Sequence, residues 1–401
     1  MMVICSQNST GLNSSNNHVI VGWMHQDEPD NDQNGAPCVD PSVIQSLYNQ
    51  WTTTDPTRPI YLNFGQGVSY TQWGGRGACT GRTDMYPEYC KGADIVSFDI
   101  YPVVSDDPII QGQLWYVPKG VDSLRMWSNY EKPVWVAIEC THIKSTVMPT
   151  PEQTKAEIWM AIIHGAMGIN YFCHEWYPSF AEAAWLTRYP EMKAAITAIN
   201  QEITELAPVL NSPTVYDVLE TKTSWRNRLS TMVKVHGGYT YIFAVFKRDR
   251  SDTVQFNLTG LPSSATAEVL SEDRSIEVVN GRFTDSFEGY GLHLYKIDAP
   301  LKIEESSVVW QRKLFRTIKF YPQPLMEDLT FVFMPEIVNQ KIKIEIFSLQ
   351  GEKIVSLIKP QKQHWLKWDG KTSKGLVLPP GIYQLKIECQ ANIIWQKIIK
   401  L

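Results

Sequence analysis

The chain of 401 residues has no long apolar run and no marked excess of charge of either sign. No segment approaches the roughly 20 apolar residues that a membrane-spanning helix needs. With a net charge of −5, the chain lacks the basic composition by which proteins bind nucleic acid or an anionic membrane surface. We therefore expect neither a membrane span nor a nucleic-acid partner.

Cysteine is scarce and follows no metal-binding spacing. The seven cysteines fit no zinc pattern, so they predict no metal site, and we expect no cofactor. Cys38, Cys79 and Cys90 fall in loop sequence rich in Gly and Pro, where a Cys79–Cys90 bridge would imply an oxidising compartment. The N-terminus has no charged segment followed by an apolar one, so it predicts no signal peptide.

Aromatic residues, in contrast, are abundant, with 14 Trp and 18 Tyr. They are the usual material of large cores and also of platforms on which sugar rings stack. The length of the chain predicts two or three domains rather than one.

In residues 1–210, short apolar runs alternate with helical patterns. The runs are continuously apolar, which indicates strands buried on both faces of a parallel sheet that is covered by helices. They cover residues 19–25, 58–64, 93–101, 133–139 and 168–176. Between the last two, Thr150, Pro151 and Gln153 predict a helix start with a capping box. The repeat predicts an α/β domain of the (β/α)8-barrel type, with a further helix near 190–206.

From residue 211 the pattern becomes all-β. Alternating strands on either side of Gly237 and Gly238 predict a hairpin, and the pattern continues to about residue 298. We expect a β-sandwich accessory domain over 211–298 and a linker over 299–316.

Residues 317–401 form a second all-β segment. Its turn signals are Trp368-Asp369-Gly370, Gly375 and Pro380-Gly381-Ile382-Tyr383. In their order and spacing, these resemble the immunoglobulin-like module shared by flagellar hook-capping proteins and the C-terminal sorting domains of secreted bacterial enzymes. The resemblance implies a secreted or cell-surface protein, with Trp368 and Tyr383 in the core of the module.

Two of the strands expected in residues 1–210 end in glutamate. Asp27-Glu28-Pro29 follows the first, and Glu139 closes the fourth. The active site of a (β/α)8 enzyme is built at the C-terminal ends of its strands. Two carboxyl groups there suit glycoside hydrolysis, in which one donates a proton and the other attacks the sugar or activates water.

The order of these motifs over residues 19–210 resembles that of the retaining glycoside hydrolases of clan A. In that clan the acid/base Glu ends strand four and the nucleophile Glu ends strand seven, and Glu28 and Glu139 are likewise three strands apart. The resemblance implies hydrolysis of β-glycosidic bonds in an oligo- or polysaccharide, with these two residues in those roles. It also places Tyr101 near the nucleophile and Trp176 as the aromatic platform under the sugar.

Other residues are candidates for substrate contact or rivals for a role. The clan usually has Asn before the acid/base, whereas this chain has Asp27, whose charge would raise the pKa of Glu28. Asn63 ends the second expected strand and is a further candidate for binding substrate. Glu175 rivals Glu139 because it also ends a strand. The other candidates are Trp73 and Trp115 as weaker platforms, and His25, His142 and His174 as structural or pocket-lining residues.

The five expected strands are too few to close an eight-stranded barrel. If Glu28 ends strand four, the first three βα units are missing, and a partner chain or a missing N-terminal segment would have to complete the barrel. Without them we expect weak or no turnover. The alternative function is therefore a non-catalytic, carbohydrate-binding or surface-attached fragment of such an enzyme.

Overall fold

The computed structural model of the chain describes residues 2–216, 218–224, 229–302, 318–321, 328–334, 337–348, 352–389 and 392–400. The chain divides into two compact units, Met1–Leu301 and Lys302–Leu401. Most of the expected linker, from residue 303 to 316, lies outside the described residues.

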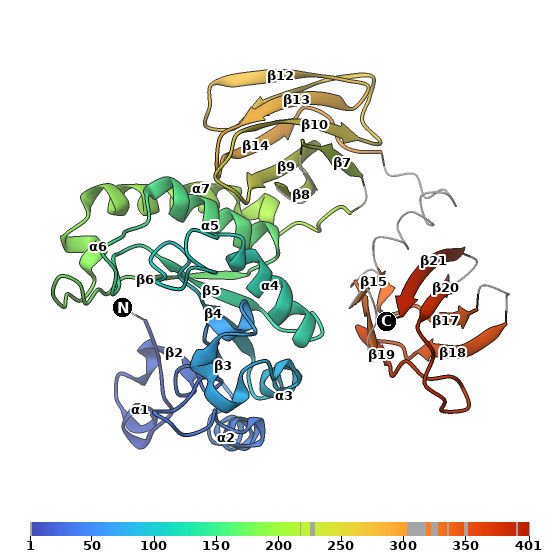
Figure 1. The fold of residues 1–401 in the computed structure, drawn as a ribbon. Helices are drawn as coiled ribbons and strands as arrows, with labels where there is room; N and C mark the ends of the chain where they lie inside the picture. Colours follow the sequence, from blue (N-terminus) through green and yellow to red (C-terminus); the bar gives the residue numbers. More distant parts are fainter. Residues whose placement is uncertain are drawn as a thin grey trace. The chain divides into compact units, whose positions relative to one another are not determined.

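The first unit contains a six-stranded parallel sheet (Figure 1). Its strands are β1 (Val3–Cys5), β2 (Ile20–Met24), β3 (Ile60–Phe64), β4 (Ile95–Asp99), β5 (Val134–Glu139) and β6 (Gly168–Phe172). They lie side by side in chain order, and each neighbouring pair is parallel. A sequential order means that every crossover moves in the same direction, as in a (β/α) barrel; a doubly wound sheet reverses direction.

The expectation of five strands is wrong by one strand. β1 pairs in parallel with β2, so the sheet has six strands. Only three residues form β1, all of them half-buried, and the short apolar run that contains them lacks the length of the runs that mark the other strands.

Helices connect the strands and cover one face of the sheet. They are α1 (Ser9–Asn13), α2 (Pro41–Thr54), α3 (Tyr86–Cys90), α4 (Tyr116–Trp127), α5 (Pro151–Ile163), α6 (Ala184–Thr187) and α7 (Pro190–Leu210). The capping box predicted for α5 is confirmed: Gln153 N–H donates to the Thr150 hydroxyl, and Thr150 N–H donates to the Gln153 side chain. The helix expected near residues 190–206 is α7.

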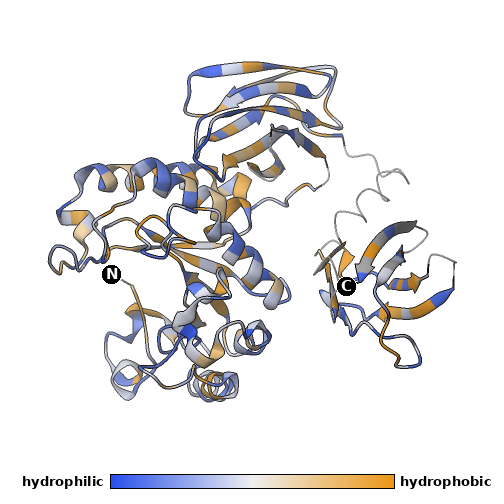
Figure 2. Cartoon of the chain, in the orientation of Figure 1, coloured by the Kyte–Doolittle hydropathy of each residue, from blue (hydrophilic) through white to orange (hydrophobic). Residues whose placement is uncertain are grey.

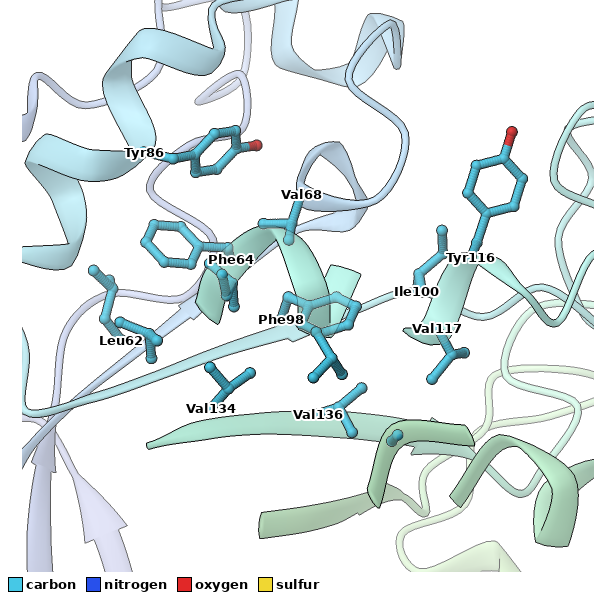
Figure 3. Packing of buried hydrophobic residues seen from close by; sticks show 14 of the residues in the cluster. Leu62, Phe64, Val68, Tyr86, Phe98, Ile100, Tyr116, Val117, Val134 and Val136 are labelled. Carbon is cyan, nitrogen blue, oxygen red and sulfur yellow. The ribbon is translucent and has the colours of Figure 1, made fainter. Parts of the chain in front are cut away.

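Alternation along the strands separates a helix-packed face from a polar one. Figure 3 shows Leu62 and Phe64 of β3 packed with Phe98 of β4 and with Val134 and Val136 of β5, in the cluster that the helices cover. Because strand side chains alternate between faces, the intervening residues lie on the opposite face of the sheet. There the amide of Asn170 donates to the hydroxyl of Tyr61 at 2.8 Å, which joins β6 to β3.

An antiparallel eight-stranded sheet follows in the same unit. Its strands are β7 (Leu219–Lys222), β8 (Leu229–His236), β9 (Tyr239–Phe246), β10 (Asp252–Leu258), β11 (Ser264–Val269), β12 (Arg274–Val279), β13 (Arg282–Phe287) and β14 (Leu292–Ile297). The predicted hairpin is confirmed, since β8 pairs with β9 across Gly237 and Gly238, and both glycines have the positive φ that such a tight turn requires.

Helices α5 and α7 lie between the two sheets of the first unit (Figure 1). Trp159 of α5 is fully buried and stacks on Phe243 of β9, with ring centroids 5.5 Å apart. Apolar residues from both sides share one cluster around this pair. The core of the first unit is therefore continuous from the α/β part to the eight-stranded sheet.

This shared core predicts a single unfolding transition for the two parts. Trp159→Ala should lower the free energy of unfolding by about 3–5 kcal/mol, because it removes a buried indole and leaves a cavity. Urea denaturation followed by circular dichroism measures the change. Trp365→Ala, at a partly exposed position of the second unit, is the matched control. Separate transitions, with only one moved by Trp159→Ala, would contradict a common core.

The second unit is built from two antiparallel sheets. One contains β15 (Ile318–Tyr321), β16 (Leu329–Phe333) and β19 (Trp365–Trp368). The other contains β17 (Ile342–Phe347), β18 (Lys353–Lys359), β20 (Gly381–Cys389) and β21 (Asn392–Lys400). The prediction that Trp368 and Tyr383 contribute to its core is confirmed, since they are 2% and 7% exposed and belong to one apolar cluster. In Figure 2 the apolar positions of the strands alternate with polar ones.

Among the described residues, no helix is both long and apolar enough to cross a membrane.

Candidate functional site

The segment after β2 is fixed against the end of β3. The main-chain N–H of Glu28 donates to the carbonyl of Asn63 at 3.1 Å, and the Asn63 amide donates to Asp27 Oδ1 at 3.0 Å. Glu28 has a φ of 46°, in the left-handed region that a non-glycine residue adopts at a cost. The amide of Asn31 donates to Glu28 Oε2 at 2.7 Å. The turn thus holds the Glu28 carboxyl group at the C-terminal edge of the sheet.

Glu28 meets Asp99, the last residue of β4, rather than a basic group. Their side chains share a hydrogen bond, and the hydroxyl of Tyr101 donates to Asp99. Burial raises the pKa of Asp99 well above its usual range, and the neighbouring Glu28 raises it further. Burial also raises the pKa of Glu28, as do the charges of Asp27 and Asp30. Two carboxyl groups in contact retain a proton between them, so the pair can act as an acid near neutral pH.

Asp30 joins the turn that carries Glu28 to the loop after β3. Its fully buried carboxylate accepts from the main-chain N–H of Gly65 at 3.0 Å and from the hydroxyl of Tyr86 at 2.9 Å. Arg76 Nε lies 3.9 Å from it, and donates to the Asp30 carbonyl at 3.1 Å. The loop that carries Glu28 is therefore tied to the loop after β3.

A disulfide reinforces the same junction. Cys38, in the loop after β2, is bonded to Cys79, in the loop after β3. The Cys79–Cys90 pairing considered from the sequence is wrong, because Cys90 is a buried free thiol in α3. Cysteine spacing did not identify the bridge, because the pairing depends on how the two loops meet across neighbouring strands.

Glu139, at the end of β5, lies in a different environment. Its carboxylate accepts from the main-chain N–H groups of Val103 and Val104, at 2.6 and 2.9 Å, and it is fully buried. Its other partner is Glu157 of α5, which shares a hydrogen bond with it. Burial raises the pKa of Glu157 well above its usual range, and the neighbouring Glu139 raises it further. Burial raises the pKa of Glu139 to about 7.

This pair predicts a pH dependence of stability. The pKa of Glu139 rises from 4.5 to about 7 on folding, so the folded state binds the proton more tightly than the unfolded state. The free energy of unfolding should therefore fall between about pH 4.5 and pH 7, by on the order of 3 kcal/mol from Glu139 alone, and the raised pKa of Glu157 should extend the fall to higher pH. Glu157→Gln should make the fall smaller and raise stability at neutral pH, because it removes the second raised carboxyl group while keeping a hydrogen-bond donor.

Urea denaturation at several pH values between 5 and 8 tests this expectation. The exposed Glu131→Gln is the control of equal charge change. An equal pH slope in the wild type and in Glu157→Gln would mean that Glu157 contributes nothing to the slope.

Glu175, the rival candidate for the nucleophile, is held in contacts with Arg188 and Tyr189. It is fully buried, its Oε1 pairs with the Arg188 guanidinium, and its Oε2 accepts from the Tyr189 hydroxyl at 2.7 Å. The next residue, Trp176, is 44% exposed and stacks on Phe172 with ring centroids 5.7 Å apart. Phe172 in turn lies 5.2 Å from Tyr101. The aromatic rings thus lead from the carboxyl pair to the surface.

Two of the weaker candidates, His25 and Trp115, are held in structural contacts. His25 Nε2 contacts the Gly92 carbonyl at 2.8 Å, and its ring stacks on Trp51. Trp115 stacks on Tyr116 and lies under the Arg248 guanidinium. Among the residues that the structure describes, no group of three or more His, Cys, Asp or Glu could hold a metal ion.

The sequence interpretation thus singled out Glu28, Asp27, Asn63 and Tyr101, which the structure brings together. It missed Asp99, Asn31 and Asp30. Asp99 could have been found from the rule that polar residues at strand ends build the site, because it is the last residue of its strand. Asn31 and Asp30 carry no comparable signal, since they belong to an acidic loop.

No curated protein matches the sequence. Among solved structures, the chain is similar to an α-amylase from Geobacillus thermoleovorans, with 11% identity, 72% of this chain and 61% of that chain covered, and a TM-score of 0.42. It is also similar to a GH30 endoxylanase from Clostridium papyrosolvens, with 13% identity, 69% and 65% covered, and a TM-score of 0.39. An α-L-arabinofuranosidase from Thermotoga maritima matches with 12% identity, 68% and 65% covered, and a TM-score of 0.38.

These three solved structures are described as glycoside hydrolases. The chain spans less than two thirds of each. At identities and TM-scores this low, the likeness by itself decides no activity. The C-terminal resemblance is confirmed directly: residues 319–401 match the family model of the secretion system C-terminal sorting domain.

Proposed function

We propose that the first unit hydrolyses β-glycosidic bonds of an oligo- or polysaccharide by a retaining mechanism with two carboxyl groups, in a protein that is secreted or displayed at the cell surface. The observation that carries the proposal is the pair formed by Glu28 and Asp99 at the C-terminal edge of the parallel sheet. A site rich in carboxyl, amide and phenol groups suits a neutral, polyhydroxylated substrate. The match of residues 319–401 to the sorting domain supports secretion or display at the cell surface.

In this mechanism Glu28 is the general acid and base. Burial raises the pKa of Glu28, which favours its role as the acid that protonates the leaving oxygen and as the base that later activates water. Asp99 shares its proton and holds the Glu28 side chain in place. Asp27, Asn63 and Tyr101 provide the surrounding groups for sugar hydroxyls, and Trp176 provides an apolar face for the ring.

Glu139 is the nucleophile in this proposal, as the motif order implies. A retaining reaction needs the two carboxyl groups roughly 5–5.5 Å apart, with the nucleophile open to the sugar. Both oxygens of Glu139 accept main-chain N–H groups here, so the segment of Val103 and Val104 has to release one of them. Asp99 is the second candidate for the nucleophile, because it already contacts Glu28.

The competing function is a carbohydrate-binding fragment without turnover. Reducing-sugar release during long incubations with β-linked and α-linked polysaccharides separates the two. Hydrolysis of a β-linked polysaccharide that disappears in Glu28→Gln supports the enzyme. Retention of a polysaccharide without any release of sugar, in the wild type and the variant alike, supports the binding fragment.

A further inference from the structure

The loop of residues 175–183, here called the aromatic loop, presents apolar rings to solvent. Trp176, Tyr177 and Phe180 are 44%, 44% and 58% exposed. The rings of Trp176 and Phe180 are neighbours, with centroids 5.9 Å apart. Scattered exposed apolar residues need no explanation, but a contiguous group of large rings marks a binding surface.

Main-chain hydrogen bonds and an ion pair fix the conformation of the aromatic loop. Its two ends are joined by main-chain hydrogen bonds between Glu175 and Ala181, at 3.2 and 3.0 Å. Arg188 reaches from the segment after α6 to the buried Glu175 carboxylate, and also donates to the carbonyl and the hydroxyl of Ser179, at 3.1 and 3.2 Å. This ion pair, in which Glu175 is buried and Arg188 is partly exposed, fixes the loop that carries the rings, so they are displayed in a preorganised arrangement.

A series of ring contacts connects the aromatic loop to the polar site. From Tyr101, which donates to Asp99, successive ring contacts of 5.2, 5.7 and 5.9 Å run through Phe172 and Trp176 to Phe180. The Lys144 ammonium lies 5.6 Å from the Trp176 ring, and so adds a hydrogen-bond donor beside the rings. Apolar faces bordered by polar groups suit the two sides of a sugar ring.

We infer that the aromatic loop is an extended sugar-binding surface, on which Phe180 and Tyr177 bind sugar units beyond the one that contacts Trp176. The ligand is therefore a glycan chain of several units rather than a monosaccharide glycoside. The inference rests on the proposed function for its ligand class, and it adds that recognition of the chain lies on the β6 side of the site.

Binding is tested apart from catalysis by affinity gel electrophoresis of the full chain. The gels contain xylan, mixed-linkage β-glucan, soluble cellulose derivative or dextran. The wild type should be retarded by at least one β-linked polysaccharide, and Phe180→Ala should weaken that affinity roughly tenfold. The double variant Trp176→Ala/Phe180→Ala should abolish retardation. Phe180→Tyr, which keeps the ring, should retain it. Trp365→Ala, a partly exposed tryptophan of the second unit, is the matched control and should behave as the wild type.

Since Phe180 is largely exposed, its replacement tests the surface without disturbing the core. Wild-type protein that no polysaccharide retards, or a Phe180→Ala variant as strongly retarded as the wild type, would overturn the inference. So would a concentration-dependent dimer in light scattering that Phe180→Ala dissolves, because the rings would then bind a second copy. The two proposals fail separately: polysaccharide binding lost in the double variant, without any hydrolysis, upholds this surface and rejects the enzyme. Hydrolysis that depends on Glu28, with polysaccharide binding unchanged in the double variant, upholds the enzyme and rejects this surface.

Discussion

Glu28→Ala is expected to lower kcat/KM for glycosides with poor leaving groups by roughly 10²–10⁴-fold, the usual contribution of a general acid. Loss of Glu28 removes the proton that the leaving oxygen needs as the glycosidic bond breaks. An aryl leaving group that departs readily as an anion needs little protonation, so formation of the glycosyl-enzyme should be nearly unaffected. The selective loss is therefore the signature of an acid role.

Fluorogenic aryl glycosides that release acidic and weakly acidic phenols measure this dependence. Gln26→Ala, two residues away and exposed, is the control for disturbance of the same loop. An equal loss for all leaving groups would show that Glu28 does not act as the proton donor. Loss of the protein's fold in Glu28→Ala would appear in circular dichroism, and Glu28→Gln then replaces it as the test.

Glu139→Gln is expected to abolish turnover for every leaving group, because no carboxylate would remain to attack the anomeric carbon. The amide is close to the same size, but its nitrogen cannot accept a main-chain N–H. The change therefore also disturbs the contact to Val103 or Val104. Circular dichroism and urea denaturation separate this structural cost from the chemical one.

Asp99→Asn is the matching variant at the second candidate position. Asn keeps a donor toward Glu28, so activity should persist at a reduced level if Asp99 holds the acid in place. Turnover that survives Glu139→Gln and disappears in Asp99→Asn would assign the nucleophile to Asp99.

The sequence predicted most of the scaffold because its strands are strongly patterned. Val134 to Glu139 and Tyr239 to Phe246 read as strands, since one is continuously apolar and the other follows a tight glycine turn. The capping box at Thr150 could also be predicted, because it depends only on residues within one helical turn. β1 was missed because its apolar run is too short to predict a strand on its own.

The site was less predictable, because its contacts join distant segments. The hydrogen bond between Glu28 and Asp99 depends on how β2 and β4 lie across β3, and periodicity along one strand does not report it. The enclosure of Glu139 by Val103, Val104 and Glu157 depends in the same way on the β4–α4 connection and on α5. Residue type and strand position predict which groups reach the edge of the sheet; packing decides which of them meet.

The most direct test of the proposed mechanism is trapping of the glycosyl-enzyme with activated 2-deoxy-2-fluoro-β-glycosides. The fluorine slows breakdown of the intermediate, so that even slow turnover accumulates it. The account predicts a mass increase of one fluoro-sugar on the intact chain, mapped by peptide mass spectrometry to Glu139 and absent in Glu139→Gln. A label on Asp99, or hydrolysis of the corresponding unmodified glycosides with inversion and without any label, would contradict it.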